Sequence, residues 1–276
     1  MANLIRVAKS GSDWGPSDLD AFNISIIEQD EETFFDGPLP AYKGPAGFIQ
    51  RKGPIGVFQQ DERIDGLDKS SLALIKRLDL AINITGGEES AVVDFAAEVL
   101  RAMDYEAETM TVCTRKDIRF IMCGEPVYAK TDVFVLDLLS EILLLVQEDK
   151  SHIRPQDPES QLIAGAIATF QFNNAKRVND FLFQDPLPTM VIPGITMTGT
   201  FPKFYKIKVT ADLDRCVRYG QFPTVKTIVY RHTPRVPGRR SDGMRPLDNR
   251  EHILRCYEGF RSAVTGCKDL IPLVLC

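Results

Sequence analysis

The sequence lacks any segment suited to enter or cross a membrane. No run of about 18 uncharged apolar residues occurs, so no transmembrane helix is expected. Residues 1–14 include basic side chains but no apolar stretch of the kind that a secretory signal peptide needs. We therefore expect an intracellular protein without a membrane partner, and the sequence does not distinguish the cytoplasm from the nucleus.

Cysteine and histidine are too few and too irregularly spaced to indicate a metal or disulfide framework. The six cysteines include no C-x-x-C pair, and the chain holds only three histidines. A chain of 276 residues also buries a sizeable core without covalent cross-links. The sequence therefore predicts reduced, mostly buried thiols and argues against a zinc site built from Cys and His.

Several nucleotide-binding and hydrolase motifs are absent as well. There is no P-loop, no H-E-x-x-H, no G-x-S-x-G and no G-x-G-x-x-G after a strand. The net charge of −5 argues against a strongly basic nucleic-acid binder. Residues 203–262 nevertheless hold 14 Lys and Arg against 6 Asp and Glu, so contact with nucleic-acid phosphate, if made, is expected in the C-terminal third.

The first 66 residues are predicted to form an irregular N-terminal arm. They contain Gly-Pro turns, as at residues 37–38, 44–45 and 53–54, and an acidic run from Glu28 to Glu32, which are typical of a loop-rich segment. The ordered domain is expected at residues 67–276, with its core at about residues 86–210. It begins with a helix that ends before Thr85.

Helix and strand signals then alternate along the chain. Thr85 and Glu88 form a capping box for a second helix. Asp157 as the cap and Pro158 as the first helical residue start a third. This order predicts an α/β protein with a mixed sheet flanked by helices. The expected strands lie at residues 118–123, 132–137, 142–146, 189–192, 204–209 and 225–230, and a last helix at about 248–264.

One of these apolar strands ends on charged residues. Because side chains alternate along a strand, Glu148 and Lys150 share a face. If residues 138–140 form a three-residue hairpin loop, Asp132 falls opposite Val146. Asp132 and Glu148 are then diagonal neighbours on that face, with Cβ atoms about 7–8 Å apart. A shift of two residues would keep them together, and a shift of one would separate them.

Two carboxylates and an ammonium group on one sheet face suit phosphodiester hydrolysis. Asp132 and Glu148 would hold Mg²⁺ or Mn²⁺, because these hard cations prefer oxygen ligands. The metal would polarise the phosphoryl oxygen and lower the pKa of a bound water. Lys150 would orient that water and offset charge in the transition state.

This combination of residues resembles the PD-(D/E)XK nuclease superfamily. The resemblance consists of Asp132, the Glu148-Asp149-Lys150 triplet at the end of the next strand, and the helix that follows. It covers about residues 86–175 and implies a restriction-endonuclease-like αβββαβ core with C-terminal additions. The residue before Asp132 is Thr131, where the superfamily motif has proline.

The resemblance also implies further site residues. Glu89 stands where the preceding helix often supplies another metal ligand. Gln161 stands where one branch of the superfamily has a glutamine at the start of the following helix, but Gly165 replaces the tyrosine that accompanies it. The whole chain, including residues 194–207 and 244–250, also looks like uncharacterised fungal proteins, which brings no activity with it.

The other candidate substrate-binding residues each have two interpretations. His152, two residues beyond Lys150, is either a phosphate contact or a polar loop residue. Four arginines lie among prolines and glycines and form either a phosphate-binding loop or a solvated connection. They are Arg235, Arg239, Arg240 and Arg245.

Three functions fit these residues. The first is a Mg²⁺-dependent nuclease acting on DNA. The second is a binding protein on the same fold without catalysis, which the acidic N-terminal two-thirds favours. The third is an enzyme that uses the same carboxylate pair on a small molecule. The sequence gives neither the substrate nor the oligomeric state.

Overall fold

A computed structural model describes residues 6–50, 67–82, 90–107, 109–149, 157–179 and 184–266. Within these ranges no helix is both long enough and apolar enough to span a bilayer. The expected helix cap at Thr85 and Glu88 lies outside the described residues.

The middle of the chain forms a helix, three antiparallel strands, a second helix and a parallel strand. The three strands pair in sequence as an antiparallel meander. The fourth strand pairs parallel with the third, and the long second helix makes the crossover between them. The elements are α5 (Ser90–Ala102), β2 (Met110–Met122), β3 (Glu125–Asp137), β4 (Ile142–Glu148), α6 (Pro158–Asn179) and β5 (Thr189–Thr198).

The strands and the last helix predicted for the C-terminal part are confirmed. They are β6 (Phe201–Thr210), β7 (Thr227–His232) and α8 (Leu247–Thr265). An additional helix, α7 (Ala211–Tyr219), was not predicted, although its end signals are good. Thr210 caps its first turn and Gly220 ends it in a left-handed conformation at φ +63°, which glycine adopts without strain.

The N-terminal segment is not irregular, so this prediction is wrong for residues 6–50. The segment contains η1 (Gly11–Asp13), α1 (Pro16–Ala21), β1 (Ile24–Glu28), α2 (Glu31–Phe34) and α3 (Ala46–Gln50). Strand β1 pairs parallel with β7, about 200 residues away, as in Ile26 with Val229. A five-residue strand whose partner lies so far along the chain leaves little local signal, whereas its flanking turns are conspicuous.

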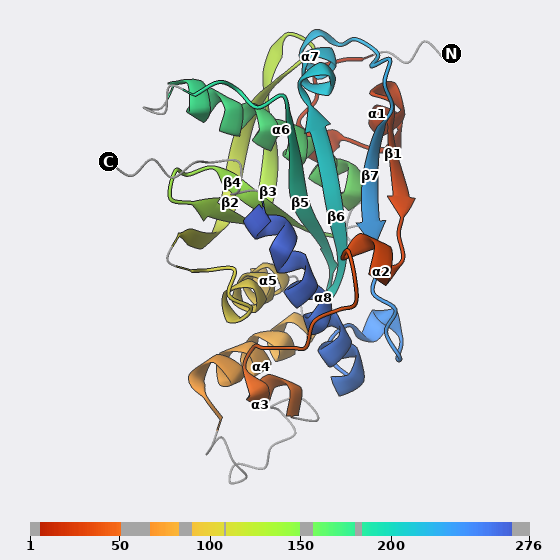
Figure 1. The fold of residues 1–276 in the computed structure, drawn as a ribbon. Helices are drawn as coiled ribbons and strands as arrows, with labels where there is room; N and C mark the ends of the chain where they lie inside the picture. The colour runs from red at the N-terminus through yellow and green to blue at the C-terminus, as the bar shows by residue number, and fades with distance from the viewer. Residues whose placement is uncertain are drawn as a thin grey trace.

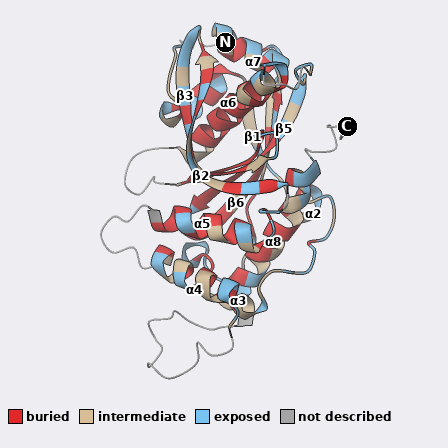
Figure 2. Ribbon diagram, turned by 90° about the vertical axis from the view of Figure 1, so that its left-hand side faces the viewer, coloured by how far each residue is buried: buried red, intermediate tan, exposed pale blue. Residues whose placement is uncertain are grey.

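The described strands form one seven-stranded mixed sheet in the order β1-β7-β6-β5-β4-β3-β2. Helix α6 covers one face, and α5 and α8 cover the other, with α4 (Lys69–Ile82) packed outside α5 (Figures 1 and 2). This is a three-layer α/β arrangement, which confirms the predicted fold class. Strands β4, β5, β7 and β1 all run in one direction and end at the same edge of the sheet.

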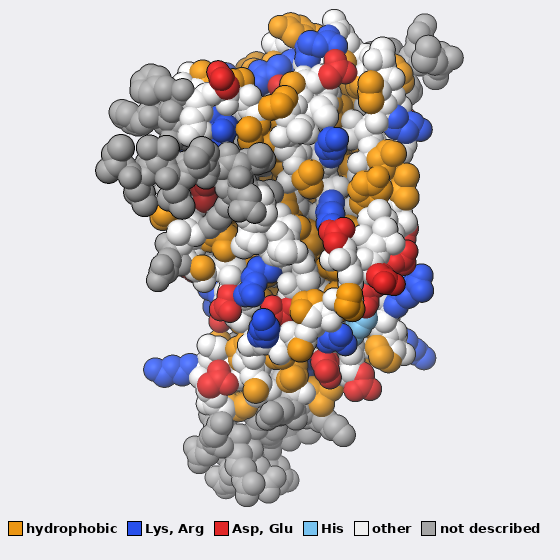
Figure 3. Space-filling view, viewed as in Figure 1, with side chains coloured by type: hydrophobic (Ala, Val, Ile, Leu, Met, Phe, Trp, Pro, Cys, Tyr) orange, Lys and Arg blue, Asp and Glu red, His pale blue; other side chains and the backbone are white. Residues whose placement is uncertain are grey.

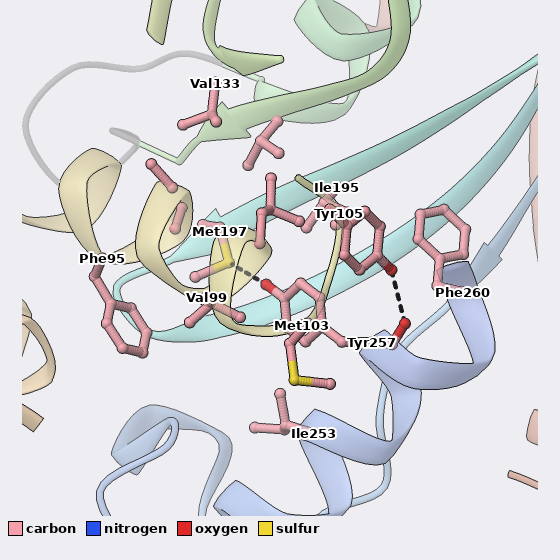
Figure 4. Packing of buried hydrophobic residues seen from close by; sticks show 14 of the residues in the cluster. Phe95, Val99, Met103, Tyr105, Val133, Ile195, Met197, Ile253, Tyr257 and Phe260 are labelled. Atoms are coloured by element: carbon pink, nitrogen blue, oxygen red, sulfur yellow. Dashed lines mark hydrogen bonds between the residues drawn. The ribbon is translucent and has the colours of Figure 1, made fainter. Parts of the chain in front are cut away.

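Each face of the sheet carries its own hydrophobic cluster. Helix α6 approaches the sheet closely, since a Cβ on Gly194 would lie 2.9 Å from a methyl carbon of Leu162. On the other face, Figure 4 shows Tyr257 of α8 between two neighbours. Its carbonyl accepts from the Tyr105 hydroxyl at 2.7 Å, and its own hydroxyl lies 3.3 Å from the Met197 sulfur.

Candidate functional site

The hairpin that carries the predicted carboxylate site begins as expected. Its turn lies at residues 138–140, and the amide of Asp137 donates to the carbonyl of Glu141 at 3.0 Å. A β-bulge then follows between Val135 and Leu136. Beyond it Val133, and not Asp132, lies opposite Val146. The predicted register is therefore wrong by one residue at the site.

The extra residue in the bulge is Leu143. Leu136 pairs with Ile142 but Val135 pairs with Leu144, so Leu143 has no partner in β3. Leu143 and Leu144 are both buried in the cluster formed with α5 and α8. A regular strand would turn one of these two leucines to the α6 face, and the bulge places both in the same core.

The bulge separates the side chains at the end of β4 into two groups. Glu148 pairs with Met197 and lies on the face of the α5–α8 cluster, with 6% of its surface exposed. Gln147 pairs with Thr196, whose hydroxyl lies 3.2 Å from that of Tyr205 on the α6 face. The carboxyl end of β4 thus presents Glu148 to one layer and Gln147 to the other.

Asp132 contacts the α6-facing group. Its Oδ2 atom accepts from Gln147 Nε2 at 2.9 Å and from the backbone amide of Glu148 at 2.8 Å. The carboxylate of Asp132 thus holds the main chain at the end of β4. The strand register places the Asp132 and Glu148 side chains on opposite faces of the sheet. The prediction that they share a face is therefore wrong.

The other predicted site residues are placed as follows. Glu89, Lys150 and His152 lie outside the described residues. Gln161 lies in the first turn of α6, where Asp157 and Pro158 begin the helix as predicted. The Gln161 amide donates to the carbonyl of Ser12 at 2.9 Å, so it fastens η1 to α6.

A polar network that the sequence did not indicate lies under the start of α6. Glu159 Oε1 accepts from the Tyr205 hydroxyl at 2.6 Å and from Arg231 at 2.8 Å. Lys203 lies 3.6 Å from the same oxygen, and Arg231 also donates to Glu28 at 2.6 Å. The network joins α6 to strands β6, β7 and β1, which approach each other only in the folded sheet.

The charges in this network balance one another. Burial by itself would raise the pKa of Glu159, but the hydrogen bonds from Tyr205 and Arg231 and the charge of Lys203 together lower it. Glu28 behaves similarly, because bonds from Arg231 and Thr233 outweigh its burial and lower its pKa. Both carboxylates stay ionised and paired, which suits a structural tie between layers better than a metal centre.

The four predicted arginines are all exposed, on the loop between β7 and α8. The buried side chain of Asn249 binds the backbone of this loop. Its Oδ1 accepts from the Gly238 amide at 2.8 Å, and its Nδ2 donates to the carbonyls of Arg239 and Gly243 at 3.2 Å and 3.1 Å. The amide of Met244 also donates to Thr200 in the β5–β6 turn at 3.0 Å. Buried hydrogen bonds thus order the backbone of the loop, and its arginine side chains are exposed to solvent.

The positive charge of this loop is not part of a larger basic surface on the face shown in Figure 3. Figure 3 shows basic and acidic side chains interspersed over the face in view, without a broad basic surface. Among the described residues, no carboxylate lies within ion-pair distance of Arg235, Arg239, Arg240 or Arg245. The loop therefore offers guanidinium groups that these carboxylates do not hold in ion pairs, although the charge of Arg235 also acts on Asp30.

Comparison with known proteins does not assign this chain to a family. No protein-family model matches the chain, and no curated protein matches it significantly.

Proposed function

We propose that this protein is a non-catalytic nucleic-acid-binding protein built on a restriction-endonuclease-like core. The order of α5, β2, β3, β4, α6 and β5 supports the core, with an antiparallel meander followed by a parallel strand. This is the αβββαβ order implied by the PD-(D/E)XK resemblance. Fold alone does not give function, so the rest of the proposal depends on the site.

The one-residue shift at the end of β4 is the observation that carries the non-catalytic part. Metal-dependent phosphodiester hydrolysis needs carboxylate oxygens that converge on one cation. Here the Asp132 carboxylate bonds Gln147 and the main chain, whereas Glu148 faces the opposite layer. The position facing α6 that a carboxylate would occupy beside Asp132 is held by Gln147, a neutral amide and a poor ligand for Mg²⁺.

The arginine loop supports the binding part. Guanidinium groups pair with phosphate oxygens in bidentate fashion, and their affinity for nucleic acid comes largely from released counterions. Four such groups lie on a backbone that Asn249 orders in advance, so less loop entropy is lost on binding.

A binding titration tests this proposal. Fluorescence anisotropy would follow labelled duplex DNA, single-stranded DNA and RNA at several salt concentrations. We expect the double variant Arg239→Glu with Arg240→Glu to weaken binding by at least about tenfold and to reduce the salt slope by about two. The matched control is Arg119→Glu with Lys130→Glu, two exposed residues on the β2–β3 hairpin at the opposite edge of the sheet. Equal losses in both variants, or no binding at all, contradict the proposal.

A Mg²⁺-dependent nuclease is the second candidate, favoured by the proximity of the two acidic residues. Asp132 Oδ2 lies 2.8 Å from the Glu148 amide, so the motif residues of adjacent strands do meet at the carboxyl edge of the sheet. Plasmid, single-stranded DNA and RNA would be incubated with Mg²⁺ or Mn²⁺. Cleavage by the unmodified protein that disappears in Asp132→Asn, Glu148→Gln and Lys150→Ala would replace our first proposal with this one.

A further inference from the structure

We propose that Glu31, His232 and Cys256, with His252 beside them, form a binding site for a zinc-type divalent transition metal. One ligand atom from each of the first three residues lies within 4.8 Å of the others. Carboxylate oxygen, imidazole nitrogen and thiolate sulfur are the donors that zinc takes in proteins. The site does not involve Asp132, Glu148 or the arginine loop, so it is independent of the proposed function.

Three elements that are distant in sequence build this cluster. Glu31 begins α2, His232 ends β7 and Cys256 lies in the middle of α8. Figure 1 shows α2 beside the lower end of β7, with α8 next to it. The rings of Phe34 and Phe35 pack on the His232 imidazole at centroid distances of 5.5 Å and 5.1 Å, which fixes the plane of that ring.

The hydrogen bonding of His232 leaves the lone pair of its Nε2 atom available to a metal. His232 is 2% exposed, and its Nδ1 lies 3.1 Å from the carbonyl oxygen of Gln29. A carbonyl only accepts, so Nδ1 carries the proton and Nε2 carries the lone pair. Among the described residues, Nε2 has no hydrogen-bond partner although it is buried. A metal-bound histidine has the same arrangement, with its second nitrogen donating to a backbone carbonyl.

The thiol and the second histidine lie on one face of α8. Cys256 is fully buried, and His252 precedes it by four residues, which is one helical turn. His252 Nε2 lies 3.3 Å from Glu31 Oε2. Glu31, His232 and Cys256 therefore supply three ligand atoms, and His252, which contacts Glu31, supplies the fourth ligand of the proposed tetrahedral site.

The three ligand atoms lie within 4.8 Å of one another. Ligand atoms around tetrahedral zinc lie about 3.5 Å apart, so closing the cluster on a cation needs a movement of at most about 1.3 Å. Glu31 supplies that movement, because its side chain is 38% exposed and lies at the end of a four-residue helix. On binding, the Cys256 thiol gives its proton to solvent and coordinates as the thiolate.

Metal titration of the purified full chain tests the site. After dialysis against a chelator, Zn²⁺ would be titrated in competition with a chromophoric chelator, and Co²⁺ would be added in a parallel sample. We expect about one tightly bound Zn²⁺ per chain. With Co²⁺ we expect a thiolate-to-cobalt charge-transfer band in the near ultraviolet, which only a coordinated cysteine produces.

Matched variants separate this site from other ligands. Cys256→Ser should abolish the cobalt band, whereas Cys216→Ser, which removes a buried cysteine in α7, should retain it. Glu31→Gln should weaken Zn²⁺ binding at least about tenfold, while the neighbouring Glu32→Gln should not. Because the Glu31 side chain is partly exposed, its variant keeps the test valid even if Cys256→Ser fails to fold.

The proposal is overturned by either of two results. One is the absence of stoichiometric Zn²⁺ binding by the unmodified chain. The other is binding that Glu31→Gln and Cys256→Ser leave unchanged. Retention of Zn²⁺ by Asp132→Asn is expected, and loss in that variant would assign the metal to the end of β4 instead.

Discussion

Two buried polar residues at the start of α8 order the loop that carries the exposed arginines. Asn249 and Arg250 are 0% and 2% exposed, and most of their hydrogen-bonding groups point at backbone carbonyls. Arg250 donates to Met244 at 2.9 Å, to Phe48 at 2.7 Å and to Arg245 at 3.1 Å. One guanidinium thus joins α3, the arginine loop and α8.

Replacing Arg250 with methionine should destabilise the protein by about 3 kcal/mol. The methionine fills a similar volume but leaves three carbonyls without their donor. Urea denaturation followed by circular dichroism measures the change. The control Arg240→Met, at an exposed position of the same loop, should alter the free energy of unfolding by less than about 0.5 kcal/mol. Similar values for the two variants would show that the buried guanidinium has no special role.

The Glu159 carboxylate should make the free energy of unfolding depend on pH. Its pKa is lowered from 4.5 in the folded state, so its contribution is present above pH 4.5 and is lost as the pH falls through the folded value. The difference in unfolding free energy between the unmodified protein and Glu159→Gln should therefore shrink between about pH 6 and pH 3. Urea titrations at a series of pH values measure this difference. A difference that stays constant with pH would contradict the lowered pKa.

At the scale of elements, α6 is held to the sheet by close approach as well as by its apolar side chains. Gly194 in β5 lies directly under Leu162, and Gly165 in α6 lies above Leu145. Both glycines leave room that the facing leucine fills. The apolar residues of α6 were evident from the sequence, but the partner of each glycine depends on the register between β4 and β5.

Gly194→Val should destabilise the protein by about 1–3 kcal/mol, because the added side chain meets Leu162 at less than van der Waals distance. Adding Leu162→Ala should recover part of this loss, so that the two changes are not additive. Gly266→Ala, where nothing lies within 4 Å of the added carbon, should be nearly neutral. Thermal and urea denaturation of Gly194→Val, Leu162→Ala, their combination and Gly266→Ala test the coupling. Strict additivity would show that the two residues do not contact.

At the scale of the whole molecule, the N-terminal segment completes both layers. Trp14 and Phe22 lie in the cluster under α6, whereas Phe34 and Phe48 lie in the cluster with α8. Strand β1 also covers the edge of β7, which would otherwise expose unpaired backbone groups. The segment is therefore a part of the fold and not an appendage.

A fragment of residues 67–276 should not fold as a stable monomer. It would lack four large buried aromatic side chains, each of which contributes several kcal/mol when it is fully buried, and the strand that pairs with β7. Size-exclusion chromatography and urea denaturation of the fragment and of the full chain test this expectation. A monomeric fragment with the same cooperative transition as the full chain would contradict it.

The sequence by itself determined most of the local structure. Cap residues and apolar periodicity predicted α6, and apolar or β-branched runs predicted strands that fall within β2 to β7. The last helix, at about residues 248–264, and the turn at residues 138–140 were also predicted correctly. The connection that carries the exposed arginines also follows from sequence, because prolines and glycines interrupt regular structure there, although Arg240 begins the short helix η3 (Arg240–Asp242). Such features depend on residues that are neighbours along the chain.

Only the tertiary structure decided the register at Asp132, the pairing of β1 with β7 and the cluster of Glu31, His232 and Cys256. The run from Ile142 to Val146 is apolar at every position, so its pattern does not say where a bulge falls, and the choice depends on which core accepts Leu143. Spacing along the chain argued against a Cys/His site, yet folding brings together donors that lie some 200 residues apart. Long-range packing fixes these distances, and no local sequence pattern records it.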